Sequence, residues 1–306
     1  MIDRRRFLLA GTGIATILAA GWLGAAAASP TSEEERANDA LAALEARAGG
    51  RLGVAMLDGK AGLTAGHRRD ERFTMCSTFK FSLAAAVLAR IDAGTLRATL
   101  PVPITQRDVI GHSPAVEAAL PQGALSIMAL AEAAQTLSDN GAANLLLRQI
   151  GGPEALTRFW NNMDDDVSRL DRYEPDLNMS RGEDYRDTTS PAAMARSMAT
   201  ILTGDILKPD SRARLARWMA ATTTGAKRLR AGLPEGWRAG DKTGTMAADD
   251  VPFVKVNDIA AVWRPDGSPV FITAFYEPRD RTPVTEAEAV LAEVGRIARD
   301  WMTRRN

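Results

Sequence analysis

Strand-like segments lie at both ends of this 306-residue chain, and a long helical stretch separates them. Apolar runs predict one early strand at 52–57 and late strands at about 239–246, 256–264 and 270–277. Strands at both ends of a helical middle indicate that the two chain ends share one sheet. The sequence therefore predicts an α+β fold: an antiparallel sheet built from both chain ends, flanking terminal helices and an inserted all-helical lobe.

Helical periodicity predicts a first helix from Ser32 to Ala48 and a last helix from Glu286 to Met302. The segment from Phe79 to Ile91 is apolar nearly all round, so a buried central helix closed at Gly94 is expected there. Further helices are expected at about 126–137, 141–150, 153–162, 190–203 and 209–221.

The N-terminus has the features of an export signal. Arginines at positions 4–6 precede an apolar, alanine-rich run from Leu8 to about Ala28. The Arg-Arg-x-Phe-Leu pattern resembles a twin-arginine signal. An uncleaved membrane anchor is the alternative, although the run is barely long enough to span a bilayer. A periplasmic or secreted protein is expected, with no membrane association after signal removal.

The expected domain organisation follows from these two patterns. Residues 1–28 form the export signal, and 29–306 form one domain of two lobes. The sheet-bearing lobe is expected at about 29–70 and 223–306, and the helical lobe at about 71–222.

Composition excludes several kinds of function. The 38 basic residues balance 38 acidic ones, which gives no indication of nucleic-acid binding. The two histidines, His67 and His112, show no ligand spacing, so no metal is expected. Cys76 is the only cysteine, so no intramolecular disulfide can form. It is more typical of a small buried residue than of a catalytic thiol, because no His and Asn/Asp signature accompanies it.

Four short motifs follow one another in the order needed to open an amide through a serine ester. They are Ser77-Thr-Phe-Lys80, Ser138-Asp-Asn140, Glu174-Pro-Asp-Leu-Asn178 and Lys242-Thr-Gly-Thr245. Each one alone is weak. The second is by itself typical of a helix cap, the third of an exposed helix face and the fourth of an exposed turn. Their occurrence in this order along one chain indicates a catalytic site.

The first two motifs supply a nucleophile and proton carriers. Ser77 and Lys80 are one helical turn apart, so both project from one face. Burial lowers the pKa of a lysine, and a neutral Lys80 could take the Ser77 proton. The Ser138 hydroxyl could pass a proton to the leaving nitrogen, and the Asn140 amide could orient a substrate amide.

The last two motifs supply a water-activating group and a carboxylate site. Glu174 could act as general base for a water that Asn178 directs at the ester, which would let the enzyme turn over. Lys242 and Thr243 offer a positive charge and a hydroxyl to a substrate carboxylate. Gly244 is expected to let the backbone approach the bound ligand closely.

In these motifs and their order, from about Glu33 to Trp301, the chain resembles the class A serine β-lactamases. The resemblance implies hydrolysis of the β-lactam amide of penicillin- and cephalosporin-type antibiotics, which confers resistance. It implies an acyl-enzyme at Ser77, an oxyanion hole from the backbone N–H groups of Ser77 and Thr245, and no cofactor. A monomer is expected whose partners are small-molecule β-lactams. Whether Lys80 or Glu174 is the acylation base is disputed for this family.

The resemblance also implies an omega loop with ends near Arg172 and Asp187. An ion pair between these two residues is expected to close the loop; the alternative is two unpaired surface charges. A cis bond before Pro175 is a further hypothesis. Arg228 is expected near the substrate carboxylate, with Lys227 and Arg230 as alternatives. At the cleft rim, His112 could stack on a ligand or be a plain loop histidine.

Two features depart from the family pattern. Cys76 stands where some carbapenem-hydrolysing members have a bridged cysteine, but Met246 occupies the partner position, so that bridge cannot form. The stretch 246–258 looks a few residues longer than the usual connection, and Asp249, Asp250 and Pro252 predict a protruding turn.

Two other functions share part of this pattern. A penicillin-binding D,D-peptidase has similar serine and lysine motifs but lacks the omega-loop glutamate, so Glu174 and Asn178 argue against it. A non-catalytic β-lactam sensor would need further membrane spans, and only one apolar run is present.

Overall fold

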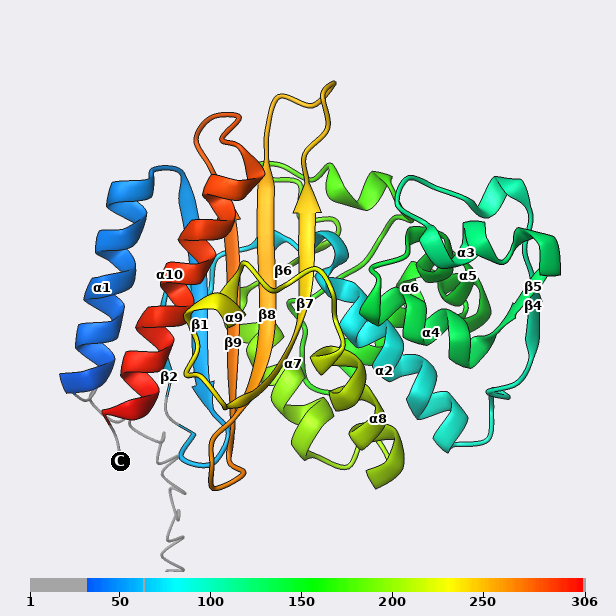
Figure 1. Ribbon diagram of the computed structural model, residues 1–306, viewed down its shortest axis with the longest axis horizontal. Helices are drawn as coiled ribbons and strands as arrows, with labels where there is room; N and C mark the ends of the chain where they lie inside the picture. The colour runs from blue at the N-terminus through cyan, green and yellow to red at the C-terminus, as the bar shows by residue number, and fades with distance from the viewer. Residues whose placement is uncertain (1–31, 63, 305–306) are drawn as a thin grey trace, which may run out of the picture. The chain divides into compact units, whose positions relative to one another are not determined.

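The computed structural model describes residues 32–62 and 64–304, and one five-stranded antiparallel sheet organises them (Figure 1). The strand order β2-β1-β9-β8-β7 pairs two early strands with three late ones. The strands are β1 (Arg51–Asp58), β2 (Thr64–His67), β7 (Arg238–Met246), β8 (Lys255–Trp263) and β9 (Pro269–Glu277). The expected sheet from both chain ends is confirmed. The export signal expected at 1–28 lies outside the described residues.

Both faces of this sheet are buried. Leu52 and Val54 of β1 belong to the core under α1 (Ser32–Ala48) and α10 (Val284–Thr303), which pack side by side on one face. Ala55 belongs to the core on the opposite face. Successive side chains of a strand point to opposite faces. Burial on both faces therefore explains why these strands appear in the sequence as continuous apolar runs.

The second core lies between the sheet and the inserted helices. At its centre is α2 (Phe79–Asp92), in which every residue from Phe79 to Leu88 is buried, as its apolar sequence predicts. The remaining helices are α3 (Pro114–Ala118), α4 (Ile127–Thr136), α5 (Asn140–Ile150), α6 (Pro153–Asn161), α7 (Pro191–Thr203), α8 (Pro209–Ala220) and α9 (Leu229–Gly232). None of the helices in the described part of the chain is long and apolar enough to cross a membrane.

The fold also contains several short elements that the sequence does not predict, of which η1 and η4 carry Ser77 and Asn178. Two strand pairs join β3 (Phe73–Thr74) to β6 (Thr188–Thr189) and β4 (Pro101–Pro103) to β5 (Ala124–Ser126). Short 3-10 turns are η1 (Cys76–Thr78), η2 (Gln106–Asp108), η3 (Leu120–Gln122) and η4 (Asp176–Asn178). Elements of two or three residues are too short to show a hydrophobic period, so only the tertiary structure reveals them.

The connection between β7 and β8 spans residues 247–254. Figure 1 shows it projecting beyond the ends of the two strands, as the sequence predicts. Asp249 and Asp250 are exposed at its turn, and Arg281 donates to the Ala248 and Asp249 carbonyls at 3.0 Å each.

Candidate active site

Ser77 and Lys80 lie where η1 runs into α2. The Lys80 Nζ donates to Ser77 Oγ at 2.9 Å, so the expected projection from one face is confirmed. Ser77 is half-buried, whereas Lys80 is fully buried. Burial lowers the pKa of Lys80, and the nearby Glu174 carboxylate opposes this shift. Ser77 therefore has beside it an ammonium group that loses its proton more easily than an exposed lysine does.

The loop between α4 and α5 places two further residues beside Lys80. Lys80 Nζ donates to the Ser138 carbonyl at 2.9 Å and to Asn140 Oδ1 at 2.5 Å. Ser138 has a φ of +60°, a conformation that non-glycine residues seldom adopt and that is often found at functional sites. Its strained backbone lets one residue present a carbonyl to Lys80 and a hydroxyl to Lys242.

Asp139, between these two residues, has the structural role that the motif suggests on its own. Its carboxylate caps α5 by accepting from the Ala142 N–H at 2.8 Å, and it also accepts from the Ala115 N–H at 2.7 Å. The helix-cap interpretation is therefore correct for Asp139, while its neighbours Ser138 and Asn140 face Lys80 and Lys242.

Lys242 approaches from strand β7. Its Nζ donates to Ser138 Oγ at 3.0 Å and to the Thr243 carbonyl at 2.8 Å. Burial, together with the positive charge of Lys80, lowers the pKa of Lys242 well below its usual value. The Thr243 hydroxyl lies 2.6 Å from the Thr224 hydroxyl. Two buried lysines thus flank the Ser77 and Ser138 hydroxyls.

Gly244 packs against the backbone that carries the nucleophile. A Cβ at this position would lie 2.7 Å from the Met75 carbonyl oxygen and 3.2 Å from the Ser77 nitrogen. A close approach that requires glycine is thus made to the η1 segment of this chain, and the approach to a bound ligand stays a prediction. This contact places the end of β7, which carries Thr245, beside the Ser77 backbone.

Glu174 lies between Ser77 and Asn178 and contacts both. Its Oε1 lies 3.3 Å from Ser77 Oγ and 3.1 Å from Lys80 Nζ, and its Oε2 accepts from Asn178 Nδ2 at 2.7 Å. Glu174 is 4% exposed. Asn178 Oδ1 is buried and accepts no hydrogen bond from any described residue. The Glu174 carboxylate therefore contacts Ser77 directly and is held on its other side by the Asn178 amide.

Asn144 fixes the backbone of Glu174, and the sequence argument does not single it out. Asn144 Oδ1 accepts from the Glu174 N–H, and its Nδ2 donates to the Glu174 carbonyl, both at 2.9 Å. Asn144 follows Asn140 by one helical turn in α5, so both lie on one face. That spacing is the signal from which its position could have been predicted.

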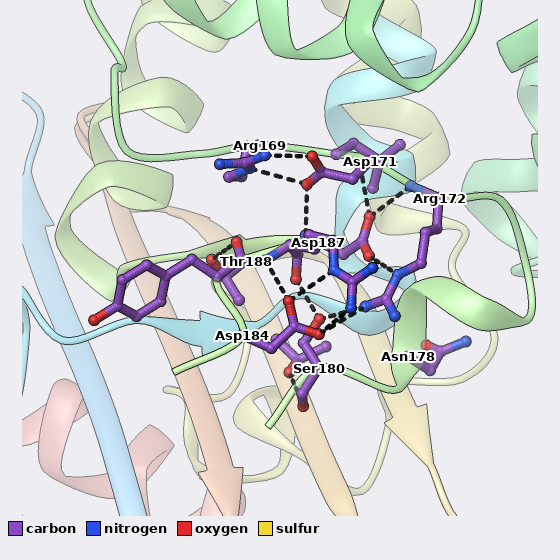
Figure 2. A network of polar contacts seen from close by, with 12 residues as sticks. Arg169, Asp171, Arg172, Asn178, Ser180, Asp184, Asp187 and Thr188 are labelled. Atoms are coloured by element: carbon purple, nitrogen blue, oxygen red, sulfur yellow. Dashed lines mark hydrogen bonds and ion pairs between the residues drawn. The ribbon is translucent and has the colours of Figure 1, made fainter. Parts of the chain in front are cut away.

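A polar network closes the loop that carries Glu174 (Figure 2). Arg172 Nε donates to Asp187 Oδ2 at 2.5 Å, and the expected ion pair is confirmed. The alternative of unpaired surface charges is wrong, because Asp187 is fully buried. The peptide bond between Glu174 and Pro175 is cis, as hypothesised.

Arg228, Lys227 and Arg230, the three residues that the sequence offers for binding a substrate carboxylate, have different surroundings. Arg228 is buried and donates to Thr245 Oγ1 at 2.7 Å and to the Gly244 carbonyl at 3.0 Å. Its Nε also lies 3.2 Å from Glu288 Oε1. Arg230 pairs with Asp241 at 2.5 Å, and Lys227 is exposed. Only Arg228 of the three is bonded to the β7 residues next to Ser77.

His112 and Cys76 have contrasting environments. His112 is exposed, and its Nε2 lies 2.9 Å from the Leu137 carbonyl, one residue before Ser138. Cys76 is fully buried, and burial raises the pKa of its thiol to about 12. A thiol that keeps its proton is a poor nucleophile. The interpretation of Cys76 as a small buried residue is confirmed.

Together these groups form a site whose geometry suits acyl transfer to a serine. A hydroxyl lies within reach of a buried lysine and of a carboxylate. A second hydroxyl bonded to a second lysine stands next to them. Covalent catalysis requires a hydroxyl placed within reach of a base and of a proton carrier, and this arrangement meets that requirement.

Comparison with known proteins identifies the family. Residues 36–302 match the family model of the beta-lactamase enzyme family. Beta-lactamase L2 of Stenotrophomonas maltophilia is 40% identical, covering 97% of this chain and 98% of that protein. Beta-lactamase AST-1 of Nocardia asteroides is 37% identical, covering 97% of this chain and 96% of that protein.

Solved structures agree. An ancestral (GNCA) class A β-lactamase is 49% identical with a TM-score of 0.81, covering 85% of this chain and 98% of that one. A β-lactamase from Burkholderia vietnamiensis is 44% identical with a TM-score of 0.84, covering 91% and 99%. The chain belongs to the beta-lactamase enzyme family and is a class A β-lactamase, a hydrolase. Hydrolysis of β-lactams, which confers antibiotic resistance, is the function of this family.

Proposed function

We propose that this chain opens the β-lactam amide of penicillin- and cephalosporin-type antibiotics in two steps, through an ester on Ser77. The observation that carries the proposal is the position of Glu174, which contacts Ser77 Oγ, Lys80 Nζ and Asn178 Nδ2 at once. One carboxylate can therefore serve the nucleophile before the ester forms and a water molecule after it has formed.

In the first step, Ser77 Oγ attacks the lactam carbonyl and its proton passes to the adjacent bases. Lys80 Nζ at 2.9 Å and Glu174 Oε1 at 3.3 Å both reach the hydroxyl, so the proton enters a coupled pair. The backbone N–H groups of Ser77 and Thr245 stabilise the oxyanion. Donors of this kind contribute about 2.7–4 kcal/mol each.

Cleavage of the C–N bond requires a proton on the leaving nitrogen. Ser138 supplies it in this proposal, supported by the 3.0 Å bond between its hydroxyl and Lys242 Nζ. The lowered pKa of Lys242 suits a group that replaces the proton which Ser138 gives away. Asn140 binds the substrate amide next to this point.

In the second step, a water molecule attacks the ester carbonyl and transfers a proton to Glu174. The oxygen of Ser77 leaves and regains its proton, and the product is a penicilloate-type acid. Asn178 Oδ1, a buried acceptor that none of the described residues satisfies, suits the second hydrogen bond of that water. Hydrolysis of the ester releases the enzyme for a further cycle.

The substrate carboxylate binds at the end of β7 in this proposal. Lys242, Thr243 and Thr245 provide a charge and hydroxyls there, and Arg228 adds a buried guanidinium bonded to Thr245 Oγ1. His112 forms part of the rim on the opposite side, beside the Ser138 loop.

The remaining proposals concern processing and organisation. Residues 1–28 act as a twin-arginine-like export signal that delivers a periplasmic or secreted monomer. Residues 29–306 form one domain, with the site between the sheet-bearing lobe at about 29–70 and 223–306 and the helical lobe at about 71–222. The enzyme uses neither a metal nor an organic cofactor, and β-lactams are its only partners.

The experiment that tests the mechanism follows benzylpenicillin absorbance with the mature protein and records the intact mass at the end. The wild type should complete many turnovers and keep its unmodified mass. Ser77→Ala should form no adduct. Glu174→Ala should acylate with Lys80 alone as base and accumulate one equivalent of adduct, because no second base is left for ester hydrolysis.

A matched control is Glu183→Ala, which removes an exposed glutamate from the same loop. It should turn over like the wild type. A stable adduct in the wild type would instead support a D,D-peptidase or a sensor. Unchanged turnover in Glu174→Ala would refute the role given to Glu174.

A further inference from the structure

Lys255, the first residue of β8, is a buried lysine that the mechanism above does not use. It is 3% exposed, and its Nζ donates to Thr74 Oγ1 at 2.7 Å, to the Asn178 carbonyl at 3.0 Å and to the Ser180 carbonyl at 2.5 Å. An ammonium group has three N–H donors, so these bonds use all of them. Among the described residues, no carboxylate lies within ion-pair distance of Lys255, and Glu277 acts on its charge only from farther away.

Such a group is costly for the folded state. Burial lowers the pKa of Lys255, which reflects the free energy of removing the ammonium from water. The Phe253 ring, centred 4.8 Å from Nζ, compensates for part of this cost by a cation–π contact. An apolar residue would fill the same space without burying a charge. The presence of a lysine is therefore better explained by what it holds than by stability alone.

What it holds is the far end of the segment that carries Glu174. Asn178 is the last residue of η4, where carbonyl groups lack partners within the turn. Lys255 supplies a donor to this carbonyl and to that of Ser180. Thr74 reinforces the contact, because its hydroxyl donates to the Ser180 carbonyl at 3.0 Å.

The two ends of the segment are thus held by different parts of the fold. Asn144 of helix α5 fixes the Glu174 backbone through two hydrogen bonds. Lys255 of strand β8 fixes the Asn178 backbone. Loss of Lys255 would leave the Glu174 anchor in place and release the amide that directs the water.

We propose that Lys255 is a positioning residue for hydrolysis of the acyl-enzyme, acting through Asn178. The inference rests on the proposed function of Glu174 and Asn178. Acylation uses side chains that Lys255 does not touch: Ser77, Lys80, Ser138 and the Glu174 carboxylate. Lys255 therefore affects the second chemical step and leaves the first nearly unchanged.

The test is Lys255→Met, which keeps an unbranched side chain and removes the three donors. In a two-step mechanism, kcat/KM includes only the steps up to acylation, whereas kcat includes ester hydrolysis. For benzylpenicillin, kcat should fall about 10- to 100-fold, as expected for a small displacement of a reacting group. KM should fall in proportion, kcat/KM should stay within about twofold of the wild type, and adduct should appear in the steady-state mass spectrum.

Thr273→Val is the matched control. Thr273 lies on β9, the strand next to β8, and its buried hydroxyl donates to the Pro191 carbonyl at 2.8 Å, so the substitution also removes a side-chain bond to a backbone carbonyl. It should lower the thermal midpoint and leave both kcat and KM unchanged. If Lys255→Met does not fold, Thr74→Val removes one acceptor of the same ammonium and should show the same pattern at smaller amplitude.

The outcomes separate this inference from the mechanism on which it rests. If Glu174→Ala traps the adduct but kcat of the Lys255→Met enzyme equals that of the wild type, the inference is wrong and the mechanism stands. An equal loss in kcat and kcat/KM would also refute it, because acylation would then depend on Lys255. If Glu174→Ala traps no adduct, the proposed mechanism itself fails.

Discussion

The buried carboxylate of Asp187 holds both the side chain and the backbone of Arg172. Oδ2 accepts from Arg172 Nε at 2.5 Å, and Oδ1 accepts from the backbone N–H groups of Asp171 and Arg172 at 2.7 and 2.9 Å (Figure 2). The Asp187 carbonyl in turn accepts from the Met75 N–H at 3.0 Å, two residues before Ser77. One residue therefore connects the loop that carries Glu174 to the turn that carries Ser77.

Asp187→Asn should destabilise the enzyme, because the half-buried Arg172 guanidinium loses the buried carboxylate that is its nearest counter-charge. The free energy of unfolding should fall by about 2 kcal/mol or more, measured by urea denaturation. Asp184→Asn is the control: its main partner, Arg186, is exposed, so a loss below about 1 kcal/mol is expected. If the two variants lost the same free energy of unfolding, the burial of Asp187 would not strengthen the stabilisation that its ion pair provides.

Gly244→Ala should slow acylation. The added Cβ would meet the Met75 carbonyl oxygen at 2.7 Å, so the strand end and the Ser77 backbone must move apart. Displacement of an oxyanion donor typically costs about 10²–10³ in rate, and the loss should appear in kcat/KM for benzylpenicillin. A thermal melt separates this effect from unfolding. Wild-type kcat/KM in a folded Gly244→Ala enzyme would argue against an oxyanion hole at this place.

Cys76 should resist alkylation in the native enzyme. Burial raises the pKa of its thiol to about 12, so at pH 8 it remains protonated, and the thiolate is the form that reacts. Iodoacetamide at pH 8 should leave the mass unchanged, whereas the urea-unfolded chain should gain one label. Cys76→Ala should keep β-lactam turnover. Rapid labelling that also stops turnover would revive the catalytic-thiol interpretation.

Glu45 should contribute to stability in a pH-dependent way. Burial alone would raise its pKa, but hydrogen bonds from Arg68 and from the Leu52 N–H outweigh burial and lower the pKa to about 2. A carboxyl with a lowered folded-state pKa stabilises the fold above its unfolded value, 4.5, and loses this contribution as the pH falls toward 2.

The measurement is the thermal midpoint between pH 6 and pH 2.5 for the wild type and for Glu45→Gln. Between pH 4.5 and pH 2.5 the midpoint of the wild type should fall more steeply than that of Glu45→Gln. Glu35→Gln, at an exposed position of the same helix, should follow the wild type. If the thermal midpoint fell with pH in the same way in all three proteins, Glu45 would not contribute to the acid sensitivity of the fold.

Local sequence patterns predicted much of the fold and of the candidate site. Apolar runs located α2 and the three late strands to within about two residues, because strand alternation and helical spacing are short-range properties. The same holds for Ser77 and Lys80, whose proximity follows from one turn of helix. The motifs named Glu174 and Asn178, but they could not say what holds these residues in place.

The sequence by itself determined the family and the sheet from both chain ends, and it predicted the residues of the candidate site, since residue types and their spacings along the chain carry this information. Only the tertiary structure decided the contacts that position them. Lys255 meets Thr74 across 181 positions, and Ser77 meets Glu174 across 97. Such pairs depend on how the helices and the sheet pack, and a short-range pattern carries no information on that packing.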